Sequence, residues 1–183
     1  EVCLVGSEMC IRDSIWGGQL QRWRTGIFNS NQPDSPTAFL PKDDEPALLP
    51  YVAKMSDDLL EFSEKPKEVM IVDENGNLLL AGDNDRRFFE AAWLHKYKGK
   101  YYFSYSTGDT HFICYAIGET PYGPFTYKGR ILNPVVGWTS HHSICEFKGK
   151  WYLFYHDSSL SKGVTHLRSV KIAEIKYNWD GSI

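Results

Sequence analysis

The fold of this chain is decided by a segment that occurs twice, as KGKYYFSY at residues 98–105 and as KGKWYLFY at residues 148–155. The two copies lie 50 residues apart, and residues 93–97 align with residues 143–147 at the same offset. Each unit has the pattern of a strand, a glycine turn and an aromatic strand. Short strands that recur about every 50 residues indicate the blades of a β-propeller.

The repeat also predicts the rest of each blade and the size of the domain. A loop, a third strand and a fourth strand should follow, the fourth ending near residues 125–127 in one unit and 175–177 in the other. Residues 15–183 would then make about three to three and a half blades. We therefore expect an all-β fold, a partial propeller whose ring is not closed. An all-β sandwich with two similar hairpins would explain the same repeat, whereas a WD-repeat scaffold would rest on the single dipeptide Trp179-Asp180.

The composition narrows the class of protein. Aromatic residues make up 15% of the chain, which suits a sheet-rich fold and offers flat rings for the apolar faces of sugars. Lys plus Arg number 20 against 23 Asp plus Glu, so we expect neither nucleic acid nor a membrane surface as a partner. No apolar run approaches the roughly 20 residues that span a bilayer.

The N-terminal part of the chain has a different sequence pattern from the repeats. Residues 1–14 resemble a translated sequencing adapter, so we predict a non-native tail there and a domain over residues 15–183, with the true N-terminus missing. Residues 29–50 predict a long loop, and residues 51–72 allow either a helical turn or strands. Residues 74–77 predict a tight turn.

The four cysteines form no C-x-x-C pair, which argues against a zinc site or a disulfide framework. We expect Cys114 and Cys145 to be buried free thiols on strands.

Glu90 is the first candidate for chemistry. It lies in the segment FFEAAW, residues 88–93, where aromatic and small apolar neighbours would partly desolvate the carboxyl group and favour the neutral form that a general acid needs. A surface or salt-bridged glutamate is the alternative. At the 50-residue offset Glu90 aligns with Ser140, which precedes His141 and His142. Strand alternation predicts that His141 faces the central channel and that His142 points between blades.

Several motifs together resemble glycoside hydrolase family 43. They are WGG at 16–18, FEAAW at 89–93, KGKYYFSYS at 98–106, GPF at 123–125, SHHS at 140–143, HLRSV at 166–170 and DG at 180–181. The resemblance implies a five-bladed β-propeller that removes α-L-arabinofuranosyl or β-D-xylosyl units from plant polysaccharides with inversion.

The resemblance also implies roles for individual residues. Glu90 matches the general acid of the family, whose second carboxylate, an Asp of the first blade, activates the attacking water. A third Asp adjusts the pKa of the acid. Neither Asp has a counterpart in this chain, and Asp13, which lies in the tail, is not a substitute.

The remaining site residues follow from the same resemblance. His141 matches a central histidine that lies next to a bound calcium ion or its waters. Arg168 matches an arginine that reaches the sugar hydroxyls, although a strand arginine paired with an acid is the alternative. Trp16 would line the sugar subsite or belong to the core.

The expected function is that of a fragment of an inverting exo-glycosidase, inactive by itself. No cofactor is needed for its chemistry, calcium would be a structural ion, and a plant cell-wall oligosaccharide or polysaccharide is the expected partner. The family implies a secreted or periplasmic location. A non-catalytic carbohydrate-binding propeller is the alternative, and the choice between arabinose and xylose stays open.

Overall fold

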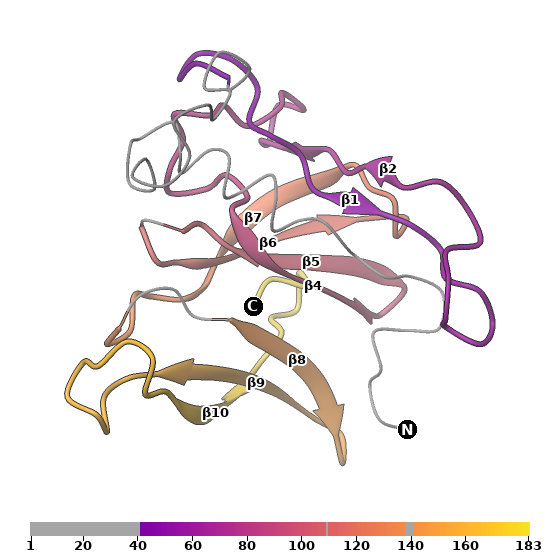
Figure 1. The fold of residues 1–183 in the computed structure, drawn as a ribbon. Helices are drawn as coiled ribbons and strands as arrows, with labels where there is room; N and C mark the ends of the chain where they lie inside the picture. Colours follow the sequence, from indigo (N-terminus) through magenta and orange to yellow (C-terminus); the bar gives the residue numbers. More distant parts are fainter. Residues whose placement is uncertain (1–40, 109, 138–140) are drawn as a thin grey trace.

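The computed structural model describes residues 41–108, 110–137 and 141–183. Within these ranges every regular element is a strand and none is a helix, as the sequence predicts (Figure 1). No helix in this part of the chain could therefore cross a membrane. The strands are β1 (Tyr51–Val52), β2 (Lys67–Glu68), β3 (Ile71–Val72), β4 (Glu90–Tyr97), β5 (Lys100–Ser106), β6 (Ile113–Gly118), β7 (Phe125–Leu132), β8 (His142–Phe147), β9 (Lys150–Asp157) and β10 (Ser169–Ile175).

The strands form two main sheets that repeat the same up-and-down order. The larger sheet has the order β3-β7-β6-β5-β4, with β3 parallel to β7 and the other pairs antiparallel. The smaller sheet has the order β10-β9-β8 and is antiparallel throughout. Its strands β8 and β9 correspond to β4 and β5 at the 50-residue offset, so this part of the repeat is confirmed.

The first hairpin of each sheet owes its tight turn to a Lys-Gly pair. Lys98 and Gly99 have φ angles of 46° and 84°, and Lys148 and Gly149 have φ angles of 52° and 76°. Two successive residues with positive φ make the turn whose twist matches that of the flanking strands.

The predicted end of the fourth strand is wrong in both units. In the larger sheet the fourth strand, β7, begins at Phe125 instead of ending there, because Pro124 and Gly123 form the turn that precedes it. In the smaller sheet Ile175 ends the third strand, β10. The loop after the aromatic strand is longer in this unit, which shifts β10 along the sequence and breaks the 50-residue offset.

The residues before β3 cover one face of the larger sheet (Figure 1). Residues 51–72 contain the short strands β1, β2 and β3 and no helical turn. At the tight turn, Asp73 Oδ1 accepts hydrogen bonds from the amides of Asn75 and Asn77 at 2.9 and 2.8 Å, so the predicted turn is confirmed.

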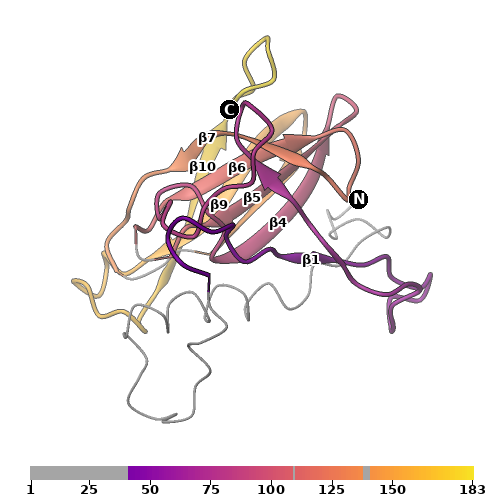
Figure 2. The same cartoon turned by 90° about the horizontal axis from the view of Figure 1, so that it is seen from above.

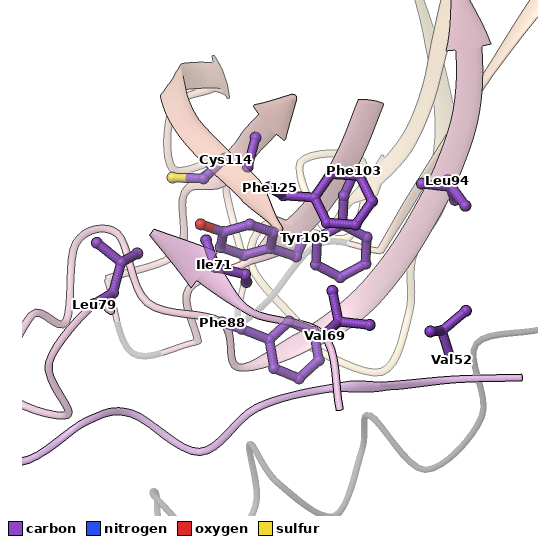
Figure 3. Packing of buried hydrophobic residues seen from close by; sticks show 11 residues of the cluster. Val52, Val69, Ile71, Leu79, Phe88, Leu94, Phe103, Tyr105, Cys114 and Phe125 are labelled. Atoms are coloured by element: carbon purple, nitrogen blue, oxygen red, sulfur yellow. The ribbon is translucent and has the colours of Figure 1, made fainter. Parts of the chain in front are cut away.

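The main core lies between this segment and the larger sheet. Figure 3 shows its side chains pointing toward one another from both layers. Its buried residues are Val52, Val69, Ile71, Leu79, Phe88, Leu94, Phe103, Tyr105, Cys114, Ala116 and Phe125. Cys114 is a buried free thiol, as expected, whereas Cys145 is only partly buried. Burial raises the pKa of the Cys114 thiol to about 11, which keeps it protonated and unreactive.

The two sheets meet along β4 and β8. The indole of Trp93 donates a hydrogen bond to the carbonyl oxygen of Ile144 at 3.1 Å, and Ser104 Oγ lies 2.7 Å from Nε2 of His142. These contacts join strands about 40 to 50 residues apart, and they fix the starts of β4 and β8 relative to each other.

The C-terminal segment crosses back from the smaller sheet to the larger one. Tyr177 stacks on Tyr97 with ring centroids 3.7 Å apart. The hydroxyl of Tyr102 donates to the carbonyl oxygen of Gly181 at 2.7 Å, and the amide of Ile183 donates to the hydroxyl of Tyr115 at 3.0 Å. Residues 177–183 therefore bind to the larger sheet although they follow the smaller one.

Candidate functional site

A β-bulge aims the side chain of Glu90. Glu90 is the first residue of β4 and pairs with Ser106, but the register shifts between Glu90 and Trp93. Within the shift Ala91 is buried and has a φ angle of 60°, a conformation that alanine rarely adopts. Bulges often redirect a side chain next to a site, and strained backbone of this kind is concentrated at functional positions.

Glu90, the first residue of β4, lies next to His141, which directly precedes β8. Nε2 of His141 is 3.7 Å from Oε1 of Glu90. The Glu90 side chain is 15% exposed, whereas the His141 side chain is 49% exposed. A carboxyl group that is mostly shielded from water beside an accessible imidazole can hold or release a proton toward a bound molecule.

His156, on β9, connects His141 to Arg168. Its Nε2 accepts a hydrogen bond from the backbone amide of His141 at 3.1 Å, and Nη1 of Arg168 lies 3.2 Å from the same nitrogen. Nε of Arg168 donates to the carbonyl oxygen of Thr165 at 2.9 Å. Burial, and then the charge of Arg168, lowers the pKa of His156, so the ring stays neutral and can accept both bonds.

His142 points the other way, between the two sheets, as strand alternation predicts. His142 is only partly exposed, and its Nδ1 is buried. Burial lowers its pKa to about 3, with smaller contributions from His141 and His95. His142 Nδ1 has no hydrogen-bond partner among the described residues. A buried lone pair costs less than a buried N–H group, so we assign the proton to Nε2, which faces Ser104.

A shallow hollow of about 230 Å³ opens beside these residues. It is lined by His141, His142, Ser143, Phe154, Tyr155, His156 and Val170. Imidazole groups and aromatic rings around a small depression suit a ligand that has both hydroxyl groups and an apolar face, such as a sugar.

Three of the four predicted site residues are thus described, and two of them are in direct contact. Glu90 lies beside His141, and Arg168 joins them through His156. Trp16 lies outside the described residues, as do residues 1–14 and the boundary predicted at residue 15. His156 was missed, although the repeat could have found it, because it aligns with Ser106, the strand partner of Glu90.

No group of three or more His, Cys, Asp or Glu side chains in the described part of the chain could hold a metal ion. Calcium prefers six to eight oxygen ligands. His141 offers a nitrogen, so its side chain fits contact with the waters of a hydrated ion and does not fit direct ligation of calcium.

The two repeated sheets meet along their inner strands, as blades of a partial β-propeller do. A carboxyl group and polar side chains gather where these inner strands begin. The sequence profile of glycosyl hydrolases family 43 matches residues 43–183. The chain therefore belongs to glycosyl hydrolase family 43.

Similar proteins agree with this assignment. A "Xylosidase/arabinosidase" of Bacteroides ovatus is 59% identical over 169 residues, which are 92% of this chain and 50% of the relative. The solved structure of RS223 β-xylosidase is 69% identical, with a TM-score of 0.77, over 79% of this chain and 45% of that chain. Another similar structure is that of CoXyl43, a β-xylosidase/α-arabinofuranosidase from a compost metagenome, solved with xylotriose in a calcium-free form. It is 64% identical with a TM-score of 0.80, and the match covers 92% of this chain and 50% of that chain.

The chain thus spans about half the length of the relatives that it matches. The two sheets correspond to part of the propeller of these enzymes, and the expected partial propeller is confirmed.

Proposed function

We propose that this chain carries the general acid of an inverting, exo-acting glycosidase that releases α-L-arabinofuranosyl or β-D-xylosyl units from plant polysaccharides. The observation that carries the proposal is the position of Glu90, shielded from water, at a bulge and 3.7 Å from His141. Membership of family 43 supports hydrolysis of glycosidic bonds. The Bacteroides ovatus relative is named a xylosidase/arabinosidase, which supports the release of either sugar.

In this proposal Glu90 donates its proton to the oxygen of the departing group. The water that attacks the sugar from the opposite face is activated by a second carboxylate, about 6.5–9.5 Å away in inverting enzymes. We assign this base, and the carboxylate that adjusts the pKa of the acid, to Asp residues outside this chain. No cofactor takes part in the chemistry.

The other site residues bind the sugar and orient water. Arg168, held by His156 and Thr165, donates hydrogen bonds to sugar hydroxyl groups. His141 orients a water or the hydration shell of a structural calcium ion, and Trp16 lines the sugar subsite. Since polysaccharides do not enter cells intact, we propose a secreted or periplasmic site of action.

The test is substitution of Glu90 in an active enzyme, made by joining this chain to the part of the Bacteroides ovatus relative that it does not match. Glu90→Gln should slow hydrolysis of xylosides with poor leaving groups by at least ~10²-fold. Aryl xylosides with good leaving groups need little protonation and should lose much less.

Glu146→Gln is the matched control, because Glu146 lies on β8 and is exposed. It should change neither rate. Equal losses for both kinds of substrate would show that Glu90 is not the acid. A joined protein that binds xylotriose without cleaving it would favour a non-catalytic carbohydrate-binding propeller.

A further inference from the structure

Trp179 is the most exposed large apolar residue among the described ones. Its side chain is 96% exposed, so it contributes almost nothing to the core. A tryptophan ring in water is unfavourable, and packing within the described residues gives no reason for it. This exposure leaves both faces of the ring accessible to a ligand.

The backbone that carries Trp179 is firmly held. Within residues 178–182, the amide of Asn178 donates to the carbonyl oxygen of Ser182 at 2.7 Å, and Asp180 Oδ1 accepts from the amide and the hydroxyl of Ser182 at 3.0 and 2.8 Å. The bond from Tyr102 to Gly181 anchors the same turn to the larger sheet. The ring is therefore presented by a fixed turn, which reduces the entropy lost on binding.

A cavity of about 290 Å³ lies next to this turn. It is lined by Tyr97, Lys98, Lys100, Tyr102, Ile117, Lys128, Trp179, Asp180 and Gly181. This volume is at the lower end of ligand pockets, which suits one or two sugar rings.

The charges around the cavity leave a net positive lining. Lys100 is paired with Glu119 at 2.9 Å. The Asp180 carboxylate accepts two bonds from Ser182 and stays negative, because these bonds, and then the charge of Lys128, lower its pKa. Lys98 and Lys128 together outnumber this one negative charge. Within the described residues, neither Lys98 nor Lys128 forms an ion pair; Lys98 Nζ lies 5.3 Å from the centre of the Tyr97 ring.

The cavity lies at the opposite end of β4 from Glu90. Glu90 begins this strand and Tyr97 ends it, and seven steps of about 3.3 Å separate the two positions by roughly 23 Å. Figure 2 shows the yellow C-terminal turn projecting at the end toward which β4 points. A ligand at Trp179 would not touch the Glu90 end.

We propose that Trp179, Lys98 and Lys128 form a second sugar-binding site, which takes a glycan unit that bears a carboxylate, such as a uronic acid side group of a plant polysaccharide. The indole stacks on the apolar face of a sugar ring, and the ammonium groups pair with the carboxylate. The site would hold a polymer chain while the Glu90 end acts elsewhere on it. The proposal rests on family membership and not on the role of Glu90.

The experiment is NMR titration of the 183-residue chain with a glucuronic-acid-substituted xylotriose, and with unsubstituted xylotriose for comparison. The indole N–H signal of Trp179 should shift in a saturable way with the acidic sugar. Trp179→Ala should weaken binding about tenfold. Lys98→Gln and Lys128→Gln should remove the preference for the acidic over the neutral sugar, and added salt should weaken it.

The hairpin of the smaller sheet provides the matched control. Phe147, Lys148 and Lys150 repeat the positions of Tyr97, Lys98 and Lys100, with Lys150 likewise paired to Glu174, but without the tryptophan turn. Lys148→Gln should leave binding unchanged. Arg168→Ala, which affects the sugar contact at the Glu90 end, should also leave the Trp179 shift intact, so the two proposals can fail separately.

Three results would overturn the inference. One is a shift confined to signals near His141 and His156. Another is equal binding of neutral and acidic sugars that the lysine variants do not alter. The third is equal binding of a single-stranded oligonucleotide, which would mark a general anion surface.

Discussion

At the scale of single residues, His156 is the side chain on which the geometry of the site depends most. Its Nε2 faces two donors, the amide of His141 and the guanidinium of Arg168, so this nitrogen carries no proton and Nδ1 does. The lowered pKa of His156 keeps the ring neutral to a lower pH than that of an exposed histidine. One neutral nitrogen thus orients both neighbours.

Replacing this acceptor should affect substrate binding more than the chemical step. In the joined enzyme, His156→Leu should raise KM for a xyloside roughly tenfold with little change in kcat, since a hydrogen bond to a charged group contributes about 1.5 kcal/mol. His156→Gln keeps an acceptor oxygen and should recover most of the affinity. Steady-state kinetics test this, and equal effects of Leu and Gln would show that His156 only fills space.

The site was only partly predictable at this scale. Glu90 became a candidate from its apolar neighbours, and His141 because it follows Ser140, which the repeat aligns with Glu90. Arg168 was predicted by resemblance alone. His156 and Arg168 meet through a loop, residues 158–168, whose path depends on tertiary contacts that no local pattern encodes.

At the scale of elements, glycines with positive φ differ in what surrounds them. Gly99 turns the β4–β5 hairpin in open space, where an added Cβ would meet nothing within 4 Å, whereas at Gly108 a Cβ would collide with the ring of Phe89. Phe89 is buried and adjoins Glu90.

Gly99→Ala should therefore cost about 1 kcal/mol of unfolding free energy, the cost of the backbone conformation alone. Gly108→Ala should cost more, because the Phe89 ring must also move, and the position of Glu90 should change with it. Urea unfolding of both variants measures the difference, and equal losses would contradict the packing described for Phe89.

The buried histidines at the contact between the two sheets make the stability of the fold depend on pH. Burial lowers the pKa of His95 and of His142 to about 3, below the value of about 6.5 for an exposed histidine. Between these values the unfolded chain binds protons that the folded chain excludes, so stability is complete above pH 6.5 and falls as the pH decreases toward 3.

Between these pH values, each histidine should lower the free energy of unfolding by up to about 1.4 kcal/mol for each unit of decrease in pH. Chemical unfolding at pH 7.5 and pH 5 should show the loss. His142→Gln, which keeps a group able to bond Ser104, should lower the pH dependence even if it lowers stability at pH 7.5. An unchanged slope would mean that His142 titrates normally.

The strands themselves were well predicted where their spacing is set by short turns. The Lys-Gly hairpins keep the 50-residue offset because their turn length is fixed by backbone geometry. The offset fails after β9, where loop length is free to vary and only packing decides where β10 begins.

At the scale of the whole molecule, β10 is the feature that bears on solution behaviour. In the described residues it is an edge strand, with Val170 74% exposed and Ile172 61% exposed on the same face. An uncovered apolar edge favours pairing with another chain.

We therefore expect the 183-residue chain to self-associate and to show no measurable hydrolysis of nitrophenyl xyloside or arabinoside, since the proposed base lies outside it. Val170→Lys together with Ile172→Lys should reduce association in analytical ultracentrifugation. If the unsubstituted chain is monomeric, the expected self-association is wrong. If it clearly hydrolyses either nitrophenyl glycoside, the expected inactivity is wrong.

The return of residues 177–183 to the larger sheet has a consequence for synthesis on the ribosome. Tyr102 and Gly181 are 79 positions apart, and Tyr115 and Ile183 are 68 apart, so these bonds cannot form while the chain is still inside the exit tunnel. Contacts of such long range slow folding. The strands of the larger sheet are synthesised before those of the smaller one, but its tyrosine-rich end is covered only after residues 177–183 have followed β10. Until then this end is accessible to chaperones that bind nascent chains.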